Sequence, residues 1–243
     1  MKSKRSKSTV VAPREKCKIA LYTDGIRLTA PCVGNPKGKG GGKRSAIGGW
    51  SKASRRRMRE FMLSNKMPGD FAVCACTYTI PGHNLPLHET KRLWNIFQTY
   101  ARRIGVCAVW RVEIQKRGQL HWHAIAGAEG ESKEVVILLT DLWHRSLRAM
   151  GDINGDNLMN WKGAQEHSAD VQPYENGSAA WKRYLHDHTT KSKQEQVPED
   201  IGRHWGKIGK KLFAEVKPEE SIKIDWKVYC KVLRAYNRLC TPY

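Results

Sequence analysis

Apolar residues recur along this chain with two different periods. Alternation of apolar and polar residues predicts β-strands, because successive side chains of a strand point to opposite faces of a sheet. Apolar spacings of three and four residues predict amphipathic helices. The alternating stretches are 71–80, 109–114 and 118–127, with weaker signals for a hairpin at 18–29 and for strands near Leu158 and at 170–171. The helical stretches are 51–64, 87–104, 133–150, 178–191 and 222–239.

The order of the central elements is β-α-β-β-α-β, which predicts an α+β fold. We expect a central antiparallel β-sheet with split βαβ, ferredoxin-like topology and with helices packed on the sheet. The length of 243 residues suits one large domain, or a core domain with extensions. The chain therefore divides into a basic N-terminal region with a hairpin at 1–50, a core domain at 51–215 and a C-terminal amphipathic helix at 216–243.

Two histidines share one face of the strand predicted at 118–127. His121 and His123 are separated by one residue, so their side chains lie roughly 7 Å apart on the same side of the strand. A turn at Arg117-Gly118 would place Glu113 of the preceding strand opposite them. Two imidazoles and one carboxylate suit a catalytic divalent ion with open coordination positions. The alternative is that these are ordinary exposed polar residues, since a His-x-His pattern often arises by chance.

The chain carries a large excess of positive charge. Lys and Arg number 43 against 23 Asp and Glu, a formal net charge of +20. Residues 1–60 alone hold 17 Lys and Arg and three acids. Such an excess makes a polyanion the expected partner, and a nucleic acid the first candidate. The residues that we expect to contact DNA are Arg55, Arg56, Arg57, Arg59, Arg117, Lys182, Arg183 and Arg203.

Missing signals exclude several other classes of protein. No apolar stretch approaches the roughly 20 residues of a membrane span, and no apolar segment of a secretory signal follows the basic start. The seven cysteines form no CxxC pair, which argues against a zinc finger and favours free thiols in a reducing cytoplasm. The chain also lacks a phosphate-binding P-loop and the HxE…PCxxC pattern of zinc deaminases. We therefore expect a cytoplasmic protein.

The helix predicted at 178–191 offers a nucleophile. Tyr184, His188 and Lys191 stand at i, i+4 and i+7 and so share one stripe of the helix. Tyrosine suits phosphoryl transfer because its phenolate is a good leaving group, which keeps a covalent intermediate reversible. Lys191 would favour the phenolate or hold the phosphate, and His188 would accept the phenolic proton or contact the phosphate. Taken alone, Tyr184 is more simply a half-buried aromatic residue beside solvated cations.

Taken together, these motifs resemble the HUH endonucleases. The resemblance is to the rolling-circle replication initiators of small phages and plasmids, close to the filamentous-phage and microvirus-like group. It covers roughly residues 50–210. The matching segments, in chain order, are Ser51 to Arg57, Thr77-Tyr78-Thr79, Glu113 to His123, Tyr184 to Lys191 and Gly202-Arg203-His204-Trp205-Gly206. The spacing of the histidine pair, the upstream glutamate and the downstream tyrosine helix is the specific part.

The resemblance implies metal-dependent nicking of single-stranded origin DNA in a bacterial cytoplasm. His121, His123 and Glu113 would bind Mg²⁺ or Mn²⁺, which polarises the scissile phosphate. Tyr184 would attack this phosphate and leave a 5′-phosphotyrosine link and a free 3′-hydroxyl that primes replication. A host helicase is an expected partner, because the chain has no helicase motif.

The chain departs from the family pattern at two positions of the tyrosine helix. Family members often carry a lysine three residues after the tyrosine, where this chain has Asp187. Two-tyrosine members often carry their second tyrosine four residues on, where this chain has His188. Single-tyrosine chemistry is therefore expected, with Lys191 as the helix lysine and Tyr174 as the second candidate nucleophile.

Two other functions stay open. An HUH transposase or relaxase would share the chemistry, although relaxases often carry a histidine triad and an N-terminal tyrosine. A non-catalytic nucleic-acid-binding protein would use the nine tryptophans as stacking platforms. A covalent DNA adduct that resists SDS would separate an enzyme from a binding protein.

Overall fold

The chain divides into two compact units in the computed structural model, which describes residues 17–23, 25–30, 51–81, 85–115, 120–150, 167–174 and 201–240. One unit comprises Met1–Lys43 and Lys217–Tyr243, and the other Arg44–Val216. The division expected from the sequence kept the two ends of the chain as separate segments, 1–50 and 216–243. In the structure the ends belong to one unit. The helix predicted at 178–191 and the strand predicted near Leu158 lie outside the described residues.

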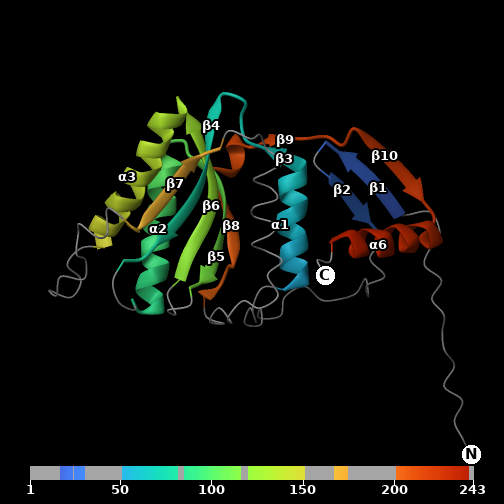
Figure 1. The fold of residues 1–243 in the computed structure, drawn as a ribbon, viewed down its shortest axis with the longest axis horizontal. Coiled ribbons are helices and arrows are strands. Elements are labelled where there is room, and N and C mark those ends of the chain that lie inside the picture. Colours follow the sequence, from blue (N-terminus) through green and yellow to red (C-terminus); the bar gives the residue numbers. More distant parts are fainter. Residues whose placement is uncertain are drawn as a thin grey trace, which may run out of the picture. The chain divides into compact units, whose positions relative to one another are not determined.

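The larger unit is built on a five-stranded antiparallel sheet, which confirms the α+β class (Figure 1). The strand order is β7-β4-β6-β5-β8, and every neighbouring pair is antiparallel. Four of the strands lie close to where alternation predicted them, whereas β8 was not predicted. The strands are β4 (Phe71–Thr79), β5 (Cys107–Ile114), β6 (Leu120–Glu129), β7 (Ala169–Pro173) and β8 (Trp205–Ile208).

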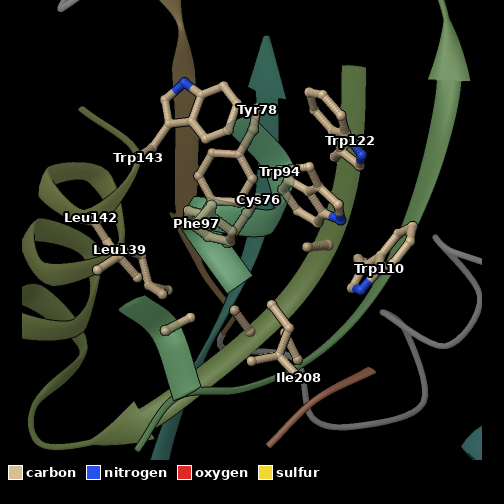
Figure 2. Packing of buried hydrophobic residues seen from close by; sticks show 14 of the residues in the cluster. Cys76, Tyr78, Trp94, Phe97, Trp110, Trp122, Leu139, Leu142, Trp143 and Ile208 are labelled. Carbon is tan, nitrogen blue, oxygen red and sulfur yellow. The ribbon is translucent and has the colours of Figure 1, made fainter. Parts of the chain in front are cut away.

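One face of this sheet is covered by α2 (Leu87–Arg103) and α3 (Ser132–Met150). Trp94 of α2 stacks on Trp122 of β6 with ring centroids 4.7 Å apart, and it meets Trp110 of β5 edge-on at 5.3 Å. Figure 2 shows these rings packed together. Such aromatic pairs contribute about 0.5–1.5 kcal/mol beyond the area that they bury. This face therefore holds the main hydrophobic core.

The opposite face is covered by α1 (Lys52–Ser64), whose buried Met58 and Met62 pack with Val109 and Ile125 of the sheet. Ser51 caps the helix, since its hydroxyl accepts a hydrogen bond from the backbone N–H of Ser54 at 3.1 Å. A short pairing of β3 (Asn65–Lys66) with β9 (Ala214–Glu215) continues from α1, and the single-turn η2 (Lys210–Leu212) lies between β8 and β9. The two faces of the sheet are thus covered by different helices, one face by α2 and α3 and the other by α1.

The smaller unit is a three-stranded sheet with one helix. The predicted hairpin is confirmed as β1 (Cys17–Tyr22) and β2 (Gly25–Thr29), and β1 also pairs with β10 (Glu220–Ile224). The helix predicted at 222–239 begins later than expected, as α6 (Trp226–Cys240). Residues 220–224 alternate and extend the sheet, and the carboxylate of Asp225 then accepts from the N–H of Val228 at 2.9 Å and caps the helix.

No helix among the described residues combines the length and the apolar character needed to cross a lipid bilayer.

Candidate metal centre

Three predicted metal ligands converge on the face of the sheet that α1 covers. Antiparallel pairing of β5 with β6 places Glu113 opposite His121, and His123 lies two residues further along on the same face. His121 Nε2 and His123 Nε2 lie 2.9 Å apart, and Glu113 Oε2 lies 3.6 Å from the first and 3.5 Å from the second. The hairpin predicted from the sequence therefore brings these three side chains together.

The spacing of the three atoms matches that of neighbouring ligands around one ion. Adjacent ligands lie about 3 Å apart around an octahedral ion and about 3.4 Å apart around a tetrahedral one, given metal–ligand bonds near 2.1 Å. The measured separations of 2.9–3.6 Å fall around both values. His121 Nδ1 is buried and has no hydrogen-bond partner among the described residues. The group of Glu113, His121 and His123 could thus hold a metal ion with Nε2 of each histidine.

The group lies in a partly closed position. The side chain of His123 is 6 % exposed, that of Glu113 11 % and that of His121 15 %. Burial of this extent strengthens electrostatic interactions, while the exposed fractions of His121 and Glu113 keep these two side chains partly in contact with solvent. An ion held here would keep open coordination positions, because the protein supplies three ligands.

Further polar contacts support the ligands. Thr77 of β4 lies opposite His123, and its Oγ1 is 3.2 Å from His123 Nδ1. For Nε2 to bind a metal, Nδ1 must carry the proton and donate it to Thr77. In the next row of the sheet, the Gln115 amide donates to Thr79 Oγ1 at 3.4 Å. Such contacts hold the orientation of a ligand ring before the ion binds.

A buried arginine holds the glutamate. Arg111 precedes Glu113 by two residues on β5, and its Nη1 lies 2.6 Å from Glu113 Oε1. That contact leaves Oε2 facing the histidines. Burial lowers the pKa of Arg111 from 12.5 to about 10, the nearby Glu113 raises it, and Arg55 of α1 lowers it further. Arg111 therefore stays protonated at neutral pH and balances the carboxylate.

His204 completes the polar surroundings of Arg111. Burial, together with the positive charge of Arg111, lowers the pKa of His204 below its usual 6.5. The imidazole is therefore neutral at pH 7. The backbone carbonyl of His204 accepts from the N–H of Val112 at 3.0 Å and so continues the pairing of β8 with β5. Neither Arg111 nor His204 was selected from the sequence as a site residue.

The arginines predicted to contact DNA do not all share one surface. On α1, Arg56 and Arg57 are exposed, whereas Arg55 and Arg59 are half-buried. The positive charge of Arg55 contributes to lowering the pKa of Arg111, the residue that pairs with Glu113. Arg203 is exposed and lies on the other side of the sheet.

The remaining predicted site residues lie outside the described residues. They are Arg117, Lys182, Arg183, Tyr184, His188 and Lys191. The second candidate nucleophile, Tyr174, is described: it packs beside the α1 core, and its N–H donates to the carbonyl of Val73 at 2.8 Å.

Comparisons with known proteins name no family for the chain. No protein-family model matches the sequence, and a search of curated proteins finds no significant match. The chemistry of the site therefore rests on its own geometry. That geometry is two imidazoles and one carboxylate at a partly open position on a strand pair, in a strongly basic chain.

Proposed function

We propose that this protein is an HUH-type endonuclease that nicks and rejoins single-stranded DNA to start rolling-circle replication. The observation that carries the proposal is the convergence of His121, His123 and Glu113 on one face of adjacent antiparallel strands. A divalent ion such as Mg²⁺ or Mn²⁺, when bound, would polarise the scissile phosphate and stabilise the charge that develops on it. The side chains chosen from the sequence for this role are the ones that the geometry brings together.

The topology of the sheet supports this proposal. Because β4 and β5 are each antiparallel to β6, they run parallel to one another with β6 between them. A helix, α2, connects the two parallel strands. This is the arrangement expected of a split βαβ, ferredoxin-like core, which is also the core of the HUH enzymes that the sequence resembles. The histidine pair would then lie on the central strand.

Charge favours a nucleic-acid substrate. The net charge of +20 attracts a polyanion, and α1, with its arginines, lies on the same face of the sheet as the metal ligands. Contacts between arginines and phosphates are independent of sequence and weaken with added salt. We expect the exposed Arg56 and Arg57 to contribute to such binding, and the half-buried Arg55 adds positive charge around Arg111.

The proposed reaction exchanges one phosphodiester for another. The Tyr184 oxygen forms a bond to phosphorus as its proton passes to His188, and the bond from phosphorus to the 3′-oxygen breaks. The 3′-oxygen takes up a proton and becomes the primer terminus, while Lys191 pairs with the phosphate. The reverse reaction reseals the strand without an energy source, because the phosphotyrosine bond retains the free energy of the broken phosphodiester.

The experiment that tests this proposal is the trapping of a covalent adduct. The full chain is incubated with labelled single-stranded origin DNA and Mn²⁺, and the products are separated in SDS. We expect a band that resists SDS, disappears with EDTA and is absent from the Tyr184→Phe variant. Tyr174→Phe is the matched control and should keep the band. An adduct that survives in Tyr184→Phe but not in Tyr174→Phe would move the nucleophile to Tyr174.

One alternative is separated by the same samples. A transposase or relaxase would form the same adduct and release the same 3′-hydroxyl, so all three kinds of enzyme would give the band, whereas a binding protein would not. A non-catalytic binding protein would retard DNA in a native gel and form no adduct under any condition. If wild-type protein binds DNA but never becomes attached to it, the enzymatic proposal is wrong.

A further inference from the structure

A pocket opens on the face of the sheet opposite the metal ligands. It has a volume of about 360 Å³, within the range of pockets that take small molecules. Its floor is apolar and includes Trp94, Trp110 and Trp122, the cluster of rings in Figure 2. Its rim is polar and comes from α2 and from residues just before β8, among them Lys91, Gln98, Arg102 and Arg203.

The pocket and the metal ligands share the same two strands but not the same face. On β6, Trp122 faces the pocket, while its neighbours His121 and His123 face the metal site. On β5, Val112 lines the pocket, and the next residue, Glu113, faces the metal site. Both sites thus lie toward the same end of the β5–β6 pair and are separated by the thickness of the sheet. A ligand in the pocket could not contact an ion held by the triad.

The lining points to a planar and negatively charged ligand. Among the described residues, those that line the pocket include three cations, Lys91, Arg102 and Arg203, and no acid. Three cations around one pocket favour an anion such as a phosphate. The indoles are 3–5 % exposed and pack on one another, so they offer a ligand ring the apolar contact of their edges. The amides of Asn95 and Gln98 offer donors and acceptors to the edge of such a ring.

Two buried donors lie at the floor of the pocket. The indole Nε1 atoms of Trp94 and Trp110 have no hydrogen-bond partner in the part of the chain that the structure describes, and the two residues are 4 % and 5 % exposed. A buried donor without an acceptor is destabilising. A ring carbonyl or ring nitrogen of a ligand, reached after a small rotation of an indole, would offset that cost. Aromatic, amide and cationic groups are thus combined as a nucleotide would require.

We propose that this pocket binds a nucleotide, with its base toward the indole floor and its phosphate at the cationic rim. The nucleotide is either a free mononucleotide or one unit of a single-stranded DNA that continues past the end of the β5–β6 pair. The proposal does not depend on nicking, because the pocket shares no residue with the metal triad. It assigns to Arg102 and Arg203 a role separate from that of the α1 arginines.

The test compares two neighbouring arginines. Arg102 and Arg103 both stand in the last turn of α2 and both are exposed, but only Arg102 lines the pocket. Arg102→Glu and Arg103→Glu therefore change the charge of the protein and the helix end equally. The full chain is titrated in a calorimeter, in EDTA, with each of the four deoxynucleoside monophosphates. The wild type should bind them, and Arg102→Glu should weaken the affinity by about tenfold or more, because a charged hydrogen bond is lost. Arg103→Glu should change it less than about twofold.

A second titration, with a single-stranded oligonucleotide, identifies the source of the nucleotide. If mononucleotides bind and depend on Arg102, the pocket takes free nucleotides. If only the oligonucleotide shows selective dependence on Arg102, the pocket takes one unit of the strand. The proposal is overturned if the two variants behave alike with every ligand, or if inorganic phosphate binds as tightly as the nucleotides. These outcomes are independent of adduct formation at Tyr184, so each proposal can fail alone.

Discussion

The pair of Arg111 and Glu113 allows a prediction in which metal binding replaces a lost charge. Arg111→Met removes the guanidinium but keeps an unbranched side chain in its buried position. Glu113 then keeps a negative charge at a mostly buried site without its partner, whose Nη1 lies 2.6 Å away in the wild type. Removing one partner of a buried ion pair lowers the stability of a protein far more than replacing both partners with apolar residues. We therefore expect the variant to be folded but clearly less stable.

The magnitude follows from the burial of both groups. Removing one partner of a buried pair costs about 3–5 kcal/mol, and we expect about 3 kcal/mol here because the Glu113 side chain is 11 % exposed and burial already opposes the charge of Arg111. For a domain of this size that loss lowers Tm by roughly 6–12 °C. Saturating Mn²⁺ would supply a positive charge at Glu113 Oε2. Mn²⁺ should therefore raise the Tm of Arg111→Met by more than it raises that of the wild type.

The assay is thermal unfolding followed by circular dichroism, with Mn²⁺ or with EDTA. The double variant Arg111→Met/Glu113→Gln is the control: it removes both charges, should recover most of the lost Tm in EDTA, and should respond little to Mn²⁺. The reasoning is refuted if Glu113→Gln lowers the Tm of Arg111→Met further. It is also refuted if Mn²⁺ shifts the wild type and Arg111→Met equally.

Three further predictions concern residues around the site. Thr77→Val removes the partner of His123 Nδ1 and should weaken Mn²⁺ binding by about 10–100-fold in calorimetry; an unchanged affinity would show that the contact does not orient the ring. Gly206→Ala would place a Cβ 2.5 Å from a ring carbon of buried Trp110 and should lower the free energy of unfolding in urea by about 1–3 kcal/mol. The control Gly69→Ala, whose Cβ would have nothing within 4 Å, should lower it by less than about 0.5 kcal/mol. Equal losses would contradict this packing. Burial lowers the pKa of His204, so below pH 6.5 the unfolded chain binds a proton that the folded protein excludes. The free energy of unfolding should therefore decrease as the pH is lowered below 6.5, and His204→Gln should flatten that dependence. An identical pH profile of the variant would exclude this residue as its source.

Much of the larger unit was predictable from its patterns because its strands bury one or both faces. β4, β5 and β6 alternate over eight to ten residues, long enough for a period of two to be read. β8 spans four residues, and its Gly206 carries no side chain to mark a face. A Cβ at that position would collide with Trp110 across the sheet, so a long-range contact requires the glycine. The pairing of β1 with β10 was also missed, since partners some 200 residues apart leave no local signal.

The candidate site was predictable only where it is local. Glu113, His121 and His123 come from two strands joined by a short connection, so alternation was enough to place them on one face. Arg111 lies two residues before Glu113 on the same strand, so the sequence already placed both side chains on the same face of the sheet. Its importance depends on burial of this face, which the sequence does not show directly. His204 directly precedes β8, and the pairing of β8 with β5 brings it near Arg111. Alternation in the sequence did not predict β8.

The charge of the site leads to a last prediction, about the coupling of metal and DNA. The metal group contains one carboxylate, and Arg111 already balances it, while metal-bound histidines are neutral. A divalent ion held there would keep nearly its full double positive charge. Such a site should bind the ion weakly when alone and more tightly when a phosphodiester is next to it.

Coupling of this kind is reciprocal, so single-stranded DNA should raise the affinity for Mn²⁺ by the same factor by which Mn²⁺ raises the affinity for DNA. We expect a factor of about 5–150, the usual range for coupled sites. Calorimetry on Tyr184→Phe measures both affinities without turnover, and Glu113→Gln is the matched control. Because that variant leaves Arg111 unbalanced, it should bind DNA more tightly without metal and gain less from Mn²⁺. If Mn²⁺ binds equally well with and without DNA, the ion is not next to a phosphate, and the role proposed for the triad in catalysis is wrong.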